Sequence, residues 1–105
     1  MEIIDFRDID SSEFRVDTLL ELLPIDEGRA SIGVATFKSG MRHPEQGLAC
    51  HEQHEISFII EGSFDLHTEE GTTVVEAGQL VYLMAGEQHA TTAKGNGKVY
   101  YVLYG

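Results

Sequence analysis

Short apolar runs separated by turn residues dominate the pattern along the chain. Runs rich in Val, Ile, Phe, Tyr and Thr cover residues 30–38, 55–61, 64–68, 72–76, 80–84 and 99–104. Glycine- or proline-containing stretches lie between them. Short strands at regular spacing, with turn signals between them, are typical of a sandwich or a barrel. The pattern therefore predicts an all-β fold.

Two glycine-containing turns are expected to reverse the chain. Glu69-Glu70-Gly71 should join residues 64–68 to residues 72–76 as a hairpin, with the glycine at positive φ. Gly95-Asn96-Gly97 should form a similar turn before the last strand.

The segment 12–23 allows two interpretations. Ser11 or Ser12 could cap a short helix, whereas Phe14, Val16 and Thr18 alternate with other residues as in a strand. We favour the strand.

Two of the expected strands are apolar on both faces. In residues 56–60 and 99–104, neither set of alternate positions is polar throughout. An antiparallel strand with one face in water should alternate more clearly, so something must cover the second face. In a chain of 105 residues a second copy is the favoured cover, which predicts a homodimer. The alternative is cover by the N-terminal segment.

Chain length and charge limit the organisation and the partners. A chain of 105 residues suits one domain, with residues 1–30 as N-terminal strands or an arm and residues 31–105 as the main barrel. The formal net charge is −11, from 18 acidic and 7 basic residues. Such a field repels nucleic acids and anionic membranes. We therefore expect neither partner.

The expected location is the cytoplasm. The chain opens Met-Glu-Ile-Ile-Asp, without a basic and then apolar signal, and no run approaches the ~20 apolar residues of a spanning helix. The only cysteine, Cys50, cannot form an internal disulfide, which fits a reducing compartment.

Histidines and a carboxylate cluster at two places in the sequence. The stretch His51-Glu52-Gln53-His54-Glu55 precedes one expected strand, and His89 follows a later one. If the local chain is extended, His51 and Glu55 face the same side and His54 faces away. Two histidines and one carboxylate suit Fe(II) with open coordination positions, and equally a catalytic zinc. Hydrogen-bonded histidines at strand ends are the alternative interpretation.

Two spaced motifs resemble those of the cupin superfamily. Residues 55–62, Glu-Ile-Ser-Phe-Ile-Ile-Glu-Gly, are similar to the end of the first cupin motif. Residues 78–89, from Gly78 through Gly86 to His89, have the spacing of the second motif. The resemblance covers residues 47–104. It implies a double-stranded β-helix (jelly-roll) barrel, commonly dimeric, that holds a metal in its mouth through His51, Glu55 and His89.

The sequence departs from the family pattern at three positions. The first histidine of the first motif is replaced by Ala49, which leaves three of the four expected ligands. In the second motif, Gln79 stands where the family has Asp and Met84 where it has Pro. Neither of these two is a usual metal ligand. The resemblance thus implies Fe, Zn, Mn or Ni held by an incomplete ligand set, or no metal at all.

A narrower likeness concerns residues 55–104. The Ile-Ile-Glu-Gly turn, the Glu-Ala-Gly segment and the closing Tyr-Tyr-Val-Leu-Tyr are similar to the cupin domain of EutQ-type ethanolamine-utilisation proteins. Those proteins lack the usual metal set, and an acetate kinase role is assigned to them. The sequence contains no Gly-x4-Gly-Lys-Ser/Thr phosphate loop, so only the barrel likeness is carried over.

The remaining polar residues are expected to play smaller parts. His54 and His67 should face outward, His43 is a loop residue that could reach the metal as a fourth ligand, and Cys50 should be inert. The four tyrosines are expected in the core or an interface, although one hydroxyl could reach the pocket as a proton donor. We select Glu55 and Tyr82 as the candidate catalytic residues.

These observations leave three hypotheses for function. The first is a metal-dependent enzyme acting on a small hydroxy, keto or sugar acid, as an isomerase, lyase or dioxygenase. The second is a metal-free module that binds or senses a small molecule. The third is a purely structural dimeric accessory protein, which predicts no pocket of useful volume.

Overall fold

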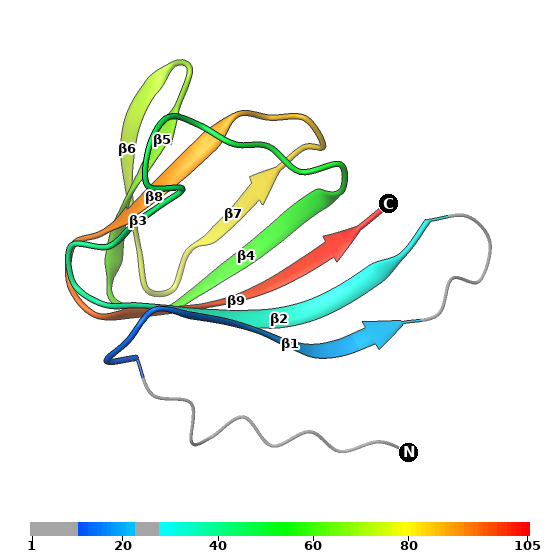
Figure 1. Cartoon of the computed structure of the whole chain (residues 1–105), viewed down its shortest axis with the longest axis horizontal. Coiled ribbons are helices and arrows are strands. Elements are labelled where there is room, and N and C mark those ends of the chain that lie inside the picture. Colours follow the sequence, from blue (N-terminus) through cyan, green and yellow to red (C-terminus); the bar gives the residue numbers. More distant parts are fainter. Residues whose placement is uncertain (1–10, 23–27) are drawn as a thin grey trace.

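Two antiparallel sheets lie face to face in the computed structural model, which describes residues 11–22 and 28–105 (Figure 1). The described part contains nine strands and no helix, so it holds no helix that could cross a membrane. The strands are β1 (Arg15–Leu22), β2 (Ala30–Phe37), β3 (Arg42–His43), β4 (His54–Glu61), β5 (Ser63–Thr68), β6 (Gly71–Glu76), β7 (Leu80–Leu83), β8 (His89–Ala93) and β9 (Gly97–Tyr104). The all-β prediction is confirmed.

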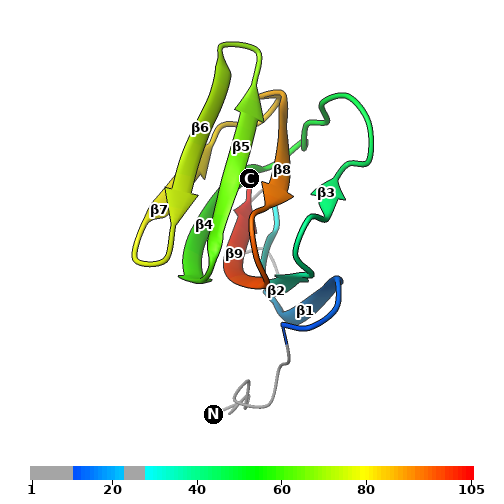
Figure 2. The same cartoon turned by 90° about the vertical axis from the view of Figure 1, so that its left-hand side faces the viewer.

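The chain passes repeatedly between the two sheets. One sheet has the order β1-β2-β9-β4-β7 and the other the order β3-β8-β5-β6. From β6 onward, successive strands alternate between the sheets, which Figure 2 shows from the side. This winding is that of the expected jelly-roll barrel.

Alternate residues of the inner strands point into the barrel and form successive layers. On β4 these are Ile59, Ser57 and Glu55, in order from one end of the barrel to the other. The register pairs them with Val99, Tyr101 and Leu103 of β9. Because side chains of a strand alternate between faces, this two-residue period carries the inward positions from an apolar layer to a polar one.

The apolar core fills one end of the barrel. Phe64 is fully buried, and its ring meets that of Phe37 edge to face, with 5.2 Å between centroids. Ile59, Ala93 and Val99 belong to the same cluster. Burial of large apolar side chains is the main favourable term in folding, so this end stabilises the barrel.

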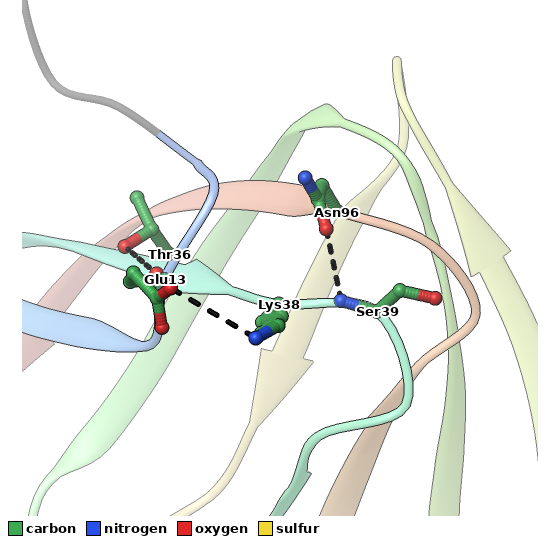
Figure 3. Close-up of polar contacts among 5 residues, drawn as sticks. All are labelled: Glu13, Thr36, Lys38, Ser39 and Asn96. Atoms are coloured by element: carbon green, nitrogen blue, oxygen red, sulfur yellow. Dashed lines mark hydrogen bonds and ion pairs between the residues drawn. The ribbon is translucent and has the colours of Figure 1, made fainter.

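Polar contacts also tie the strands together beside this core (Figure 3). The Thr36 hydroxyl donates to the backbone carbonyl of Glu13 at 2.8 Å, and Lys38 lies 3.9 Å from the Glu13 carboxylate. The backbone N–H of Ser39 donates to Oδ1 of Asn96 at 2.9 Å. The end of β2 is thereby fixed to the segment before β1 and to the turn before β9.

The hairpin predicted at Glu69-Glu70-Gly71 is confirmed. Strands β5 and β6 pair in continuous register down to Thr68 and Gly71. Gly71 has a φ of 129°, a conformation that a residue with a side chain rarely adopts.

The hairpin predicted at Gly95-Asn96-Gly97 is wrong. Strand β9 pairs with β2 and β4, whereas β8 pairs with β3 and β5, so residues 94–96 cross between the sheets. A Cβ at Gly97 would lie 2.4 Å from the ring of Phe64. Close packing against the core therefore explains this glycine.

The N-terminal segment is a strand where it is described. Strand β1 covers Arg15–Leu22 and pairs with β2, which confirms the strand interpretation of that part. Residue 23 lies outside the described residues. Two short strands, β3 and β8, were not expected from the sequence, since neither contains a run of strongly apolar residues.

Candidate metal centre

Three potential ligands meet at the polar end of the barrel. One ligand atom from each of His51, Glu55 and His89 can be chosen such that all lie within 4.8 Å of one another. His51 precedes β4, Glu55 is the second residue of β4, and His89 is the first residue of β8. The structure thus brings together the three residues that the sequence singled out.

Backbone hydrogen bonds place His51 in this group. Ala49 pairs with His89, each backbone N–H donating to the other carbonyl at 2.9 and 2.8 Å. The N–H of Gly86 donates to the carbonyl of His51 at 2.9 Å. The chain bends at residues 52–53, so the extended local chain assumed from the sequence is wrong although the predicted proximity holds.

Both carboxylate oxygens of Glu55 have partners. Oε1 lies 3.2 Å from Nε2 of His51, and Oε2 accepts a hydrogen bond from the Ser57 hydroxyl at 2.9 Å. The Glu55 side chain is only 17% exposed, against 40% for His51. A carboxylate this buried needs such partners, which also fix its orientation.

A backbone contact fixes the ring of His89. Its Nδ1 lies 3.0 Å from the carbonyl oxygen of Glu87. A carbonyl can only accept, so Nδ1 carries the proton and donates it. In a neutral ring Nε2 then keeps a free lone pair, as in histidines that bind metals. The His51 and His89 ring centroids are 5.1 Å apart.

A cavity of about 220 Å³ adjoins the three residues. Ser57, Thr91 and Tyr101 add polar groups to its wall, and the remainder is largely apolar. Ser57 and Thr91 were not among the candidate site residues predicted from the sequence. Each stands two residues from a candidate ligand on the same strand, so the two-residue period could have indicated both.

Tyr101 is the tyrosine that reaches the cavity. Its ring lies over Gly33, where a Cβ would come within 2.3 Å of ring atoms. Burial raises the pKa of Tyr101 above its ordinary value of 10.0, and the negative charges of Glu55 and Asp17 raise it further against a lowering hydrogen bond from Thr18. The hydroxyl therefore stays protonated at neutral pH and can donate.

The expected position of Tyr82 in the pocket is corrected. The register pairs Glu55 with Leu83, so Tyr82 is one residue out of phase and lies on the outer face, 48% exposed. Its hydroxyl is 3.4 Å from that of Tyr104 and 3.5 Å from Nδ1 of His54. The hydrogen bond with Tyr104 raises the pKa of Tyr82. Tyr82 does not line the cavity.

The other histidines lie outside the three-residue group. His54 accepts the backbone N–H of Ala85 at 3.0 Å on the outer face. The two ring nitrogens of His67 contact the hydroxyls of Thr72 and Thr92. His43 does line the cavity, with its ring centroid 5.4 Å from that of Phe14. Cys50 is exposed.

The structure shows the contacts and exposure of the three residues that depart from the motif. Ala49 lines the cavity directly opposite His89. Gln79 takes over a turn contact, because its Oε1 accepts the backbone N–H of Glu76 at 2.8 Å. Met84 is 58% exposed and away from the cavity.

Comparison with known proteins identifies the family. The cupin domain family matches residues 34–104, which is more than half of the chain. The chain therefore belongs to the cupin superfamily, as the two motifs indicated. No curated protein shows a significant match, so the narrower likeness to EutQ-type proteins stays a prediction.

Solved structures share the fold at low sequence identity. An RmlC-like cupin with a double-stranded β-helix fold from Methanocaldococcus jannaschii has a TM-score of 0.77 at 16% identity, covering 98% of this chain and 89% of that one. A Cupin 2 conserved barrel domain protein from Salinispora arenicola has 0.71 at 20%, covering 98% and 87%. KdgF from Halomonas sp. has 0.72 at 14%, covering 95% and 86%. These likenesses establish the barrel.

Proposed function

We propose that this cupin binds one divalent ion of Fe, Zn, Mn or Ni through His51, Glu55 and His89. The observation that carries the proposal is the convergence of their ligand atoms within 4.8 Å beside a cavity. Two imidazoles and one carboxylate suit these metals and leave coordination positions open for a substrate.

The surroundings of the three residues support this proposal. The Glu87 carbonyl holds the proton of His89 on Nδ1, and Ser57 orients the carboxylate of Glu55. Hydrogen-bonding partners of this kind accompany most metal-binding histidines and carboxylates. The residues present therefore fit a divalent metal.

We further propose an enzymatic role on a small hydroxy, keto or sugar acid, as an isomerase, lyase or dioxygenase. A bound divalent metal would supply Lewis-acid polarisation of the substrate oxygens. Glu55 would lie next to the ligand, with its carboxylate oriented by the Ser57 hydroxyl. Tyr101 would donate a proton or a hydrogen bond from the cavity wall, in the part first assigned to Tyr82.

Metal content tests the proposal directly. We expect the protein, purified without chelators and desalted, to carry close to one equivalent of Fe, Zn, Mn or Ni by elemental analysis. If it carries none, and takes up none after incubation with each of the four metals, the proposal fails.

A second candidate function is a metal-free module that binds a small molecule. The 3.2 Å contact between His51 and Glu55 favours it, since the pair satisfies itself without a metal. The substitution of the family histidine by Ala49 points the same way. The same metal analysis separates the two candidates, because this module would bind its ligand with no metal present.

The outer face of the larger sheet supports a homodimer. Phe58, Ile60, Leu80 and Tyr82 lie there with 43 to 54% of each residue exposed. Large side chains carry roughly 150–250 Å² each, so these four alone expose on the order of 400 Å². Partly exposed neighbours, including Val102 and Tyr104, enlarge this apolar face. A standard interface buries ~800 Å² per partner.

Charge favours a second copy as the partner on this face. The outward positions of β4, β7 and β9 include one acidic residue, Glu61, which the register places opposite Lys98 at the end of the face, although the chain carries 18 acidic residues. Elsewhere two chains of charge −11 repel one another. We infer that two copies pair through these strands.

Leu80→Glu should turn the dimer into a monomer. By light scattering, the wild type should have a mass of twice the 11.6 kDa of one chain, and Leu80→Glu the mass of one chain. The reason is that a buried, unpaired carboxylate opposes association. Val74→Glu is the matched control, since Val74 is 51% exposed on β6 of the other sheet. A monomeric wild type, or equal dissociation by both variants, contradicts the inference.

The exposed thiol of Cys50 supports the expected location. A lone exposed cysteine stays reduced most readily in a reducing compartment. We infer a cytoplasmic location on this basis.

A further inference from the structure

The cavity has one polar end and one apolar end. His51, Glu55 and His89 form the polar end, and Ser57 and Thr91 lie on the wall next to it. Beyond them the lining side chains are apolar, among them Ile59, Phe64, Val75, Val81 and Val99. A ligand that fills the whole cavity must match both ends.

No lysine or arginine lines the cavity within the part of the chain that the structure describes. Phosphate and carboxylate groups are usually bound by such cations, through charge-assisted hydrogen bonds. His43 and Tyr101 are the other lining residues that could donate to an anion, and neither carries a fixed positive charge. A second anionic group among the apolar side chains would lose its hydration, so the lining favours a ligand with one anionic group, at the end where the three candidate ligands lie.

The volume limits the ligand further. A cavity of about 220 Å³ lies below the roughly 300–1,000 Å³ of pockets for drug-sized ligands, so it suits a compact ligand. A polyhydroxylated ligand of that size would turn several hydroxyls toward the apolar wall, where each lost hydrogen bond with water opposes binding. A compact aliphatic group would instead bury apolar surface.

We infer that the ligand is a small α-hydroxy or α-keto monoacid with a branched aliphatic tail. Its two adjacent oxygen donors chelate the metal, and its tail contacts Val75, Val81 and their apolar neighbours. This inference rests on the proposed metal site. Within the broader substrate class it selects apolar acids over sugar acids, dicarboxylates and phosphorylated compounds.

Three acids with the same chelating head test the inference. α-Hydroxyisocaproate and malate have the same shape, with an isopropyl group in the first replaced by a carboxylate in the second, and threonate carries hydroxyls instead. Each acid is titrated into zinc-loaded protein by calorimetry. α-Hydroxyisocaproate should bind at least about tenfold more tightly than malate or threonate, a factor typical of apolar pockets that distinguish ligands differing by a small group. Tighter or equal binding of malate or threonate overturns the inference.

A pair of variants locates the tail. Val75 lines the cavity, whereas its neighbour Val74 is 51% exposed on the opposite face of β6. Val75→Thr keeps the shape but adds a hydroxyl to the wall, and should weaken α-hydroxyisocaproate binding by about tenfold. Val74→Thr should leave it unchanged. Equal effects of the two variants would overturn the assignment of the tail.

Zinc binding itself separates the two possible failures. Both valine variants should bind zinc as the wild type does, which also shows that the barrel is intact. If the wild type binds no zinc or other divalent metal, the proposed function fails and this inference with it. If zinc binds but the three acids do not rank as expected, only the ligand class is wrong.

Discussion

Replacing His51 and His89 together by alanine is expected to abolish divalent metal binding. Four-ligand structural zinc sites bind with about 10–16 kcal/mol, or roughly 3 kcal/mol for each ligand, and each 1.4 kcal/mol is a factor of ten. Loss of two ligands should thus weaken binding by about ten-thousandfold and leave Glu55 alone at the site. Elemental analysis after metal loading and desalting measures the change.

The fold should survive this double substitution. The His51 side chain is 40% exposed, and the Ser57 hydroxyl still donates to Glu55 in the variant. The matched control is His54→Ala together with His67→Ala, which removes two histidines whose rings contact other groups. The control should keep its metal. Metal retained in the first variant, or lost equally in both, would contradict the assignment of His51 and His89.

The spacing of the two motifs made the three candidate ligands predictable from sequence. Glu55 begins an apolar strand, where a buried and unpaired carboxylate is costly, so it needs a metal, a cation or hydrogen-bond partners. His51 does lie close to Glu55, but not because the chain between them is extended. The bend at residues 52–53, the Ala49–His89 pair and the Gly86 contact bring its ring toward Glu55.

The inner wall of the cavity was less predictable, because it depends on the register between strands. Tyr82 and Tyr101 both stand in apolar runs, and nothing within either run separates them. Only the pairing of Ser57 with Tyr101 and of Ile56 with Tyr82 places one inside and the other outside. A shift of one residue reverses the face of every side chain in a strand.

Strand β8 escaped prediction for a related reason. Its sequence His-Ala-Thr-Thr-Ala contains no large apolar residue. Ala90 and Ala93 are almost fully buried. Tight packing there requires small residues, so the usual apolar signal of a strand is missing.

Ala49 stands where the family has its first histidine, and the second large expected effect is that Ala49→His strengthens binding at the proposed metal site. Ala49 pairs directly with His89 across the two backbones, and both line the cavity. Opposed residues in an antiparallel pair have Cβ atoms about 4.5–5.5 Å apart, so an imidazole at position 49 would lie beside that of His89. Loss of a hydrogen-bonding partner of a metal ligand typically lowers metal affinity by ~10–100-fold. A fourth ligand should therefore raise the affinity for zinc by at least this factor.

The same substitution should act in the opposite direction on the chelating acid. A fourth protein ligand occupies a coordination position that is otherwise open, and it also fills part of a cavity of about 220 Å³. Zinc-loaded Ala49→His should therefore bind α-hydroxyisocaproate more weakly than the zinc-loaded wild type. The control is Cys50→His, which adds the same side chain at the next position, where the residue is exposed and does not line the cavity. If Cys50→His binds zinc more tightly than the wild type, or if Ala49→His does not, position 49 does not face the metal. In that case the replacement of the family's histidine by Ala49 would have no bearing on the proposed metal site.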